Sequence, residues 1–243
     1  MRSDLKVLLP ILVLISSICN SQIVDSIGVM TEDNYIEKMS NQLAMDISFN
    51  NSYEIFEVKT QNNKVILYPN TPTNLRFKLN YRFISFGFQF SPDFLPGNGD
   101  EDIKGKTKSF ELGTSLIFKH WFVDASYSKV KGYYLYNSED YNTLLPDDPY
   151  FQFPDLHYSG LNIASGFTSN SKFSLRSLTA QTERQLKSVG SFMPVFNLRY
   201  YTIDDKSAGA STQKSNNIET SVGPGYAYTF VFKENFYVSF QIN

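Results

Sequence analysis

The sequence contains very little cysteine and histidine, and both scarcities limit the chemistry that the chain can perform. Among 243 residues there is one cysteine, Cys19, and there are two histidines, His120 and His157. If an N-terminal signal is removed after Ser21, the mature chain has no cysteine, which excludes a disulfide framework and thiol chemistry.

The sequence also lacks an excess of charge of one sign and, beyond its N-terminus, a long apolar run. Lys and Arg total 22 while Asp and Glu total 24, so the chain has no basic footprint for nucleic acid. After residue 21, no apolar stretch approaches the roughly 18 residues that a membrane-spanning helix needs. The sequence therefore predicts neither a nucleic-acid-binding protein nor a helical membrane protein.

The N-terminus has the pattern of a secretory signal peptide. Basic residues precede the apolar stretch Val7–Ile18, which is too short for a comfortable transmembrane helix, and cleavage after Ser21 fits the pattern. Lipid attachment at Cys19 is the rival interpretation, but Ile18 is too large for the small residue usual before a lipidated cysteine. We expect a signal peptide over residues 1–21, a polar lead-in, helical or irregular, over 22–42, and a β-domain over 43–243.

The stretch from Asn74 to Ser91 alternates apolar and polar residues around a reversal at Arg82 and Phe83. Side chains alternate between two faces only in a strand, so the pattern predicts a β-hairpin with one apolar and one polar face. The apolar face would carry Leu75, Phe77, Leu79, Tyr81, Ile84, Phe86, Phe88 and Phe90.

The same alternation recurs along the chain and predicts a meander of neighbouring strands. A second hairpin is expected over residues 108–136, and polar loops are expected at 92–106, 137–156 and 204–217. We count ten or eleven strands, nearly all joined to their sequence neighbours. The predicted fold is an all-β, antiparallel up-and-down transmembrane β-barrel of about 10–12 strands.

The composition of the two faces indicates that the apolar one meets lipid. Aromatic residues make up 16% of the chain, and the apolar face is built of large Phe, Tyr and Leu side chains. Packing all of them inside a barrel of this size would overfill it, whereas the Ser, Gly, Ala, Asn and Gln of the polar face suit a crowded lumen. With the signal peptide, this predicts a protein of the cell outer membrane whose partner is outer-membrane lipid.

Several short motifs resemble those of a bacterial barrel family. They are NYIEKM at Asn34–Met39, GKTKSFEL at Gly105–Leu112, NSKFS at Asn170–Ser174 and ERQLKSVGSF at Glu183–Phe192. On these residues the chain from about Asn34 onward resembles domain-of-unknown-function family 4421 of Bacteroidota, whose members are predicted outer-membrane β-barrels. The resemblance implies location and fold, and it brings neither a catalytic residue nor a ligand.

Seven charged residues fall on or near the polar face of the expected strands. In a narrow lumen such residues must pair with one another or be hydrated. One interpretation is a structural ion-pair network that plugs the lumen. The other is a charge-lined solute path whose selectivity these residues would set. The residues are Arg76, Lys78, Glu111, Asp124, Arg176, Arg199 and Glu219.

No pattern for catalysis or for binding of a metal or cofactor stands out. A membrane-embedded lipid hydrolase would need His120, expected in a tight turn, or His157, expected at the end of a loop, at hydrogen-bonding distance from a serine. The acidic loop Gly97–Gly105 resembles a calcium loop in composition but lacks its full spacing and its closing Glu. We therefore expect no enzyme activity, no metal and no cofactor.

Three functions remain open at this level. We favour a structural or interaction barrel; a small passive channel or solute transporter is the alternative, and a lipid hydrolase is the third. Short turns should face the periplasm and the loops at 92–106 and 137–156 the exterior. The loop at 204–217 then falls on the wrong side, unless a short strand around Tyr150–Phe153 restores the alternation.

The end of the chain suggests an incomplete ring. The last expected strand, Phe236–Ile242, is shorter than the roughly 9–11 residues of a bilayer-spanning strand. It also lacks the terminal aromatic residue usual for strands that close outer-membrane barrels. We expect the wall to be open between the first strand, near Met45–Val58, and this last one, with further strand material beyond the end.

Overall fold

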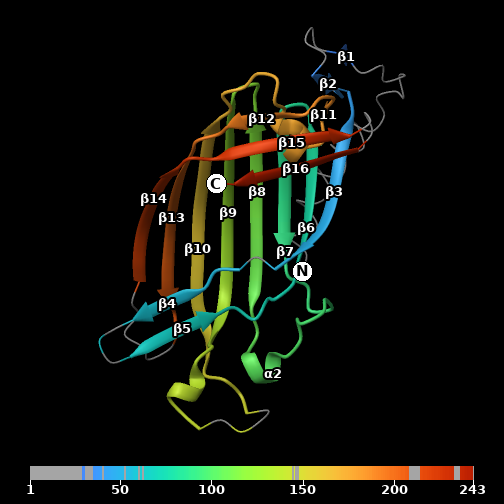
Figure 1. Ribbon diagram of the computed structural model, residues 1–243. Coiled ribbons are helices and arrows are strands. Elements are labelled where there is room, and N and C mark those ends of the chain that lie inside the picture. The colour runs from blue at the N-terminus through green and yellow to red at the C-terminus, as the bar shows by residue number, and fades with distance from the viewer. Residues whose placement is uncertain are drawn as a thin grey trace.

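The structure, a computed structural model, is mostly antiparallel β-sheet (Figure 1). It describes residues 29–30, 35–39, 41–51, 53–59, 61, 63–143, 145, 148–207, 214–232 and 236–242. The expected signal peptide and much of the expected lead-in lie outside these residues. Within them, no helix is long and apolar enough to cross a membrane.

Eight strands of the described chain form one continuous antiparallel meander, which we call the wall. Its order is β14-β13-β10-β9-β8-β7-β6-β3. The strands are β3 (Leu43–Asn50), β6 (Asn74–Tyr81), β7 (Ile84–Phe90), β8 (Lys108–Ile117), β9 (Trp121–Leu135), β10 (Gln152–Phe167), β13 (Val195–Asp205) and β14 (Lys214–Gly223).

The hairpin β6–β7 confirms the prediction from alternation. Phe77 lies opposite Phe88 and Leu79 opposite Phe86, so the apolar residues of both strands share one face. The rings of Phe77 and Phe88 stack with their centroids 5.1 Å apart. The tight reversal is possible because Arg82 adopts a φ of 52°, in the left-handed region.

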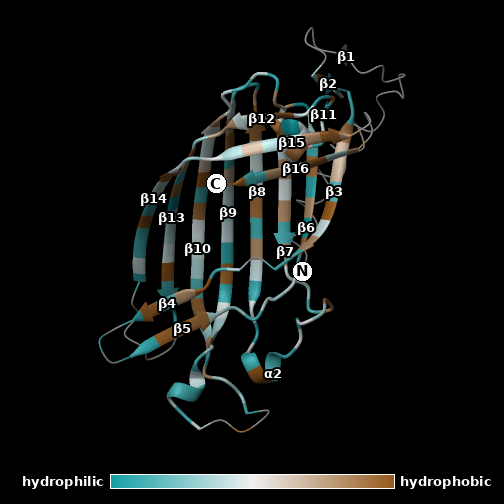
Figure 2. Cartoon of the chain, in the orientation of Figure 1, coloured by the Kyte–Doolittle hydropathy of each residue, from teal (hydrophilic) through white to brown (hydrophobic). Residues whose placement is uncertain are grey.

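The wall has an apolar outer face and a polar inner face, the reverse of a soluble barrel. On β7 the exposed fraction of Phe86 is 43%, whereas that of its neighbour Ser85 is 2%. On the edge strand β14 most residues of both faces are exposed, Val222 at 76% among them. Along the long strands, brown and paler or teal segments alternate (Figure 2). The large apolar side chains therefore cover the outer face, and the small and polar ones line the inner face.

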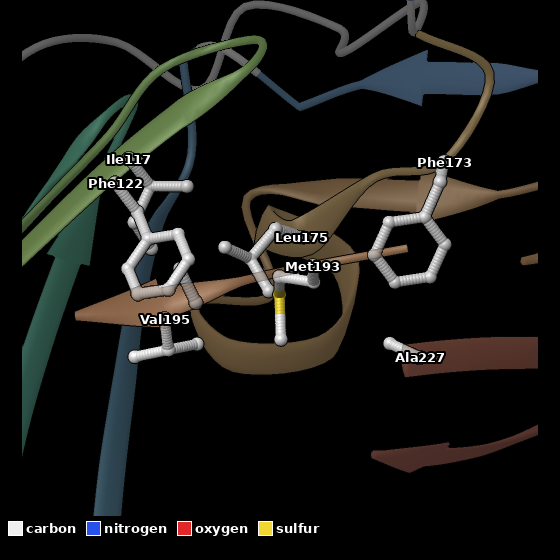
Figure 3. Close-up of a cluster of buried hydrophobic side chains, with 8 residues drawn as sticks. Ile117, Phe122, Phe173, Leu175, Met193, Val195 and Ala227 are labelled. Carbon is white, nitrogen blue, oxygen red and sulfur yellow. The ribbon is translucent and has the colours of Figure 1, made fainter. Parts of the chain in front are cut away.

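An apolar cluster, which we call the turn-end cap, fills the inner face at the end of the short turns. It is formed by the wall residues Ile117, Phe122 and Val195 packed against segments that lie across the wall (Figure 3). Those segments supply Phe173, Leu175, Ala180, Met193 and Ala227. They belong to or adjoin α3 (Leu175–Thr179), β12 (Val189–Phe192) and β15 (Tyr226–Phe232), and β15 pairs with β16 (Phe236–Ile242).

A second apolar cluster, the loop-end cap, lies at the opposite end of the wall. The hairpin of β4 (Phe56–Lys59) and β5 (Lys64–Tyr68) crosses the wall there. Phe56 and Leu67 pack on buried Tyr133 and Tyr158 of the wall. The short helices α2 (Glu101–Lys104) and η1 (Ser138–Asp140) lie in the loops of this end.

The lead-in and the segment before β12 form a small sheet outside the wall. Its strands are β1 (Val29–Met30), β2 (Ile36–Lys38) and β11 (Glu183–Gln185), in the order β1-β2-β11. The expectation of a helical or irregular NYIEKM segment is therefore wrong for Ile36–Lys38. Backbone pairing with β11, far away in sequence, makes this segment extended.

The segments that make up the wall differ from the prediction because several expected strands leave it, although the sheet that contains the wall has ten strands when β4 and β5 are included. Residues 168–194 form a single connection that contains α3, β11 and β12, and Pro224 and Gly225 separate β14 from β15. Proline cannot donate to a ladder, which is consistent with a break there. The last strand, Phe236–Ile242, pairs with β15 in a separate sheet instead of lying at the edge of the wall.

This arrangement also corrects the expected loop alternation. The short strand expected around Tyr150–Phe153 is not a separate element. Instead β10 begins at Gln152 and continues as one strand to Phe167. Because residues 168–194 are one connection, the β13–β14 connection lies at the same end as the loops after β7 and β9. Among the described residues, β3 pairs with β6 alone and β14 with β13 alone.

Candidate functional site

The candidate site is a polar cavity on the inner face, between the two caps. Its volume is about 660 Å³, and its lining extends from β6 to β14, so the wall curves around it. Small side chains such as Ser85, Ser115 and Ser126 leave this space open, because larger ones would fill the concave side. Six of the seven predicted lumen charges line it: Arg76, Lys78, Glu111, Asp124, Arg199 and Glu219.

Arg76 organises one side of the cavity. Its Nη2 lies 3.5 Å from Glu111 Oε1, and its Nε donates to Gln89 Oε1 at 3.0 Å. Asn50 Nδ2 donates to the same Gln89 oxygen at 2.8 Å. Side chains from β3, β6, β7 and β8 are thus joined across the inner face.

Arg199 organises the other side and links the wall to the loop-end cap. Its guanidinium pairs with Glu54, just before β4, and lies 3.7 Å from Glu219 Oε2. It also donates to Tyr158 Oη at 3.1 Å, and its centre stands 4.7 Å from the ring centroid of Tyr201. Planar guanidinium groups suit such combined ion pairing and stacking.

Lys78 and Asp124 line the middle of the cavity. Lys78 Nζ donates to the backbone carbonyl of Thr179 at 3.0 Å, which connects β6 to the end of α3. No cation lies within 4 Å of the Asp124 carboxylate among the described residues. The cavity therefore presents side chains of both charge signs to any solute inside it.

Arg176 is the predicted lumen charge that the structure places elsewhere. It lies in α3 and not in a strand, and its Nη1 is 3.1 Å from Glu183 Oε1, a side chain only 8% exposed. Its Nε donates to the carbonyl of Ile117 at 2.9 Å. Arg176 therefore anchors the turn-end cap to β8 instead of lining the cavity.

Three contributors to the charge network were missed by the sequence reasoning. Glu54 lies in an irregular stretch before β4, so no strand alternation could assign it to a face. Gln89 and Tyr158 are uncharged, and only their positions on the inner face mark them as partners of Arg76 and Arg199. For Gln89 and Tyr158 that signal was present in the alternation of β7 and β10.

The two histidines lie at opposite ends of the wall. His120 Nδ1 is 3.0 Å from the carbonyl oxygen of Thr168 at the turn end. His157 lies within β10 opposite Lys131, so the expectation that it ends a loop is wrong. In the described part of the chain no serine hydroxyl forms a hydrogen bond with either ring.

The carboxylates of the acidic loop form ion pairs with lysines. Lys104 Nζ lies 2.5 Å from Asp100, and Lys106 Nζ lies 2.6 Å from Glu101. The hydrogen bonds to Glu101 and Asp93 raise the pKa of Lys106. The described residues include no group of three or more His, Cys, Asp or Glu side chains placed to hold a metal ion.

Comparison with known families assigns the chain to one of them. The family model described as Domain of unknown function (DUF4421) matches residues 24–243. The chain belongs to this family. The DUF4421 match includes the wall, both caps and every residue of the charge network. No curated protein and no solved structure matches this DUF4421 chain.

Proposed function

We propose that the protein is an outer-membrane β-barrel protein whose wall faces lipid. The observation that carries the proposal is the inverted polarity of the wall, with Phe86 exposed outside and Ser85 buried inside. The outward apolar residues extend from Phe110 on β8 to Phe118 just after it. This stretch is at the lower end of the roughly 9–11 residues with which a tilted strand crosses a bilayer.

The long loops support an orientation with the loop end toward the exterior. The connections after β3, β7, β9 and β13 all lie at that end. The turns at residues 82–83 and 118–120 lie at the other, together with the longer connection 168–194 that contributes to the turn-end cap. Outer-membrane barrels place short turns in the periplasm and longer loops outside. In lipid, the free sides of β3 and β14 would need partners in addition to the pairings described above.

Within this class, we favour a structural or interaction barrel with a closed lumen. The turn-end cap and the loop-end cap each place buried apolar side chains across one end of the polar cavity. Ion pairs hold both caps, through Arg176 and Glu183 at one end and Arg199 and Glu54 at the other. Such a lumen gives water no continuous path, and the loops of the outer end would meet a partner.

A small channel or solute transporter is the second candidate, and the polar cavity favours it. A space of about 660 Å³ lined by charges of both signs could hold a small polar solute if a cap moved. Planar-bilayer recording of the reconstituted chain separates the two functions. We expect no steady single-channel current; regular unitary currents would contradict the closed barrel and support the channel.

A further inference from the structure

A hollow on the outer face of the wall, at the loop end, has a different composition from the rest of that face. Its volume is about 520 Å³, and it is lined by residues of β8, β9, β10, β13 and β14. Five lysines line it, together with His157 and Asp204: Lys108, Lys129, Lys131, Lys206 and Lys214. All five lysines are exposed to solvent.

The strand register arranges the charged residues in a row across the wall. Lys108 lies directly opposite Lys131, which lies opposite His157, and the row continues through Asp204 to Lys214. Like charges directly opposite one another destabilise a sheet. An anion between Lys108 and Lys131 would therefore relieve their repulsion.

Carboxylates of the protein neutralise the lysines of the hollow only in part. Lys131 pairs with Asp155 at 2.9 Å, and Lys206 lies 3.7 Å from Asp204. Among the described residues, no carboxylate lies within 4 Å of the amino groups of Lys108, Lys129 or Lys214. The hollow thus keeps an excess of positive charge that is open from outside.

The position of the hollow determines which anion can reach it. Two residues along β8 and β9 from the pair Lys108 and Lys131, Phe110 lies opposite Lys129. An apolar row begins two residues beyond that pair. That row consists of Leu112, Tyr127, Leu161, Tyr200 and Ile218. The lysines therefore stand immediately beyond the apolar band, at the height where the headgroups of a bilayer would surround the wall.

We propose that this hollow binds the phosphate groups of a phosphorylated lipid headgroup in the outer leaflet, with Lys108, Lys129 and Lys214 as its principal ligands. The inference rests on the proposed membrane function and goes beyond it by naming a ligand class and a site. Lysine binds phosphate as a point charge, so several lysines around one hollow suit a headgroup with more than one phosphate. The neighbouring Phe110 and Tyr127 would contact the start of its acyl chains.

Native mass spectrometry of the full chain in detergent tests the proposal. The probes are a bisphosphorylated glycolipid and the same lipid after removal of its phosphates. We expect the protein to retain the phosphorylated lipid preferentially, and the triple variant Lys108→Gln, Lys129→Gln, Lys214→Gln to weaken that preference by on the order of 100-fold. The triple variant Lys59→Gln, Lys172→Gln, Lys187→Gln removes three exposed lysines outside the hollow and should retain the preference for the phosphorylated lipid.

Each remaining outcome decides against the proposal in a recognisable way. Equal retention of the two lipids by the unmodified chain, or an unchanged preference in the first triple variant, would overturn it. Inorganic phosphate that binds the chain as tightly as the phosphorylated lipid does would show a free-anion site instead of a headgroup site. A spin label at Phe86, measured on the same chain reconstituted in vesicles, reports separately on lipid contact. If the label contacts lipid but the lipid preference is absent, only the proposed headgroup site is wrong. If the label does not contact lipid, the proposed membrane function is wrong as well.

Discussion

At the scale of single residues, Gly132 leaves no room for a side chain. Its φ is 93°, and a Cβ added there would stand 2.1 Å from the carbonyl oxygen of Lys106. Thr107 Oγ1 also donates to the Gly132 carbonyl at 2.7 Å, so this part of β9 cannot move away freely.

We therefore expect Gly132→Ala to lower the free energy of unfolding by about 3 kcal/mol or more, from backbone strain and the clash together. Gly223→Ala is the matched control, because nothing lies within 4 Å of its added Cβ and its φ is not in the left-handed region. Urea unfolding in detergent, followed by circular dichroism, compares the two variants. Equal midpoints would show that the close approach to Lys106 is not a constraint.

Arg199 is the residue on which the loop-end cap depends most. Replacing it with methionine leaves Glu54 and Glu219 without their shared cation and removes the donor to Tyr158. Hydrogen bonds to charged groups stabilise by about 1.5–3 kcal/mol each. We expect Arg199→Met to free the β4–β5 hairpin, so that trypsin cleaves faster after Lys59 or Lys64. Lys119→Met serves as the control, and cleavage at the same rate in both variants would contradict the role given to Arg199.

At the scale of elements, the turn-end cap depends on α3, a helix of five residues that cannot be stable alone. Ser174 caps it by accepting from the Ser177 N–H at 3.0 Å and donates to Glu183 Oε2 at 2.5 Å. Arg176 completes this cluster by pairing with Glu183 and bonding to the wall. The helix is thus held in place by polar contacts as well as by its apolar side.

Arg176→Gln should release this cap, because buried Glu183 loses its cation at a cost of roughly 3 kcal/mol. If the cap closes the lumen, the variant should show flickering conductance in planar bilayers where the unmodified chain shows none. Lys187→Gln, in the same connection, should stay silent. A silent Arg176→Gln variant that had verifiably lost its protease protection around α3 would mean that this cap does not block the lumen.

The sequence predicted some elements well and others badly, for a physical reason. Alternation located the hairpins β6–β7 and β8–β9, because both consist of strands with one apolar and one polar face. It missed α3 and β2, which are too short to show a period and take their conformation from distant partners. The same reason explains why the sequence predicts Arg176 in the lumen, since FSLRSLT fits a strand pattern as well as a single helical turn.

At the scale of the whole molecule, the hairpin pairs of the wall could be predicted, but the pairings β3–β6 and β10–β13 and the segments across its ends could not. Neighbour pairing follows from local hairpins, whereas the packing of β15 on the wall and of Phe56 on Tyr158 joins residues far apart in sequence. The candidate cavity was predictable in its charges, because inner-face positions alternate regularly. The pairing of these charges, and the contribution of Glu54, required the three-dimensional arrangement.

The central claim is that the outer face of the wall meets lipid, and spin labels test it most directly. Cys19 is the sole cysteine, so a chain with Cys19→Ser accepts single labels at chosen positions. We would place them outside, at Phe86 and Leu112, and inside, at Ser115 and Ser126, in the chain reconstituted in vesicles. Oxygen, which dissolves in lipid, should relax the two outer labels strongly and the two inner ones weakly. A water-soluble nickel complex should relax neither pair strongly, because lipid shields the outer labels and the two caps close the lumen. Outer labels that the nickel complex relaxes strongly, or that oxygen relaxes no more than the inner ones, would contradict the account.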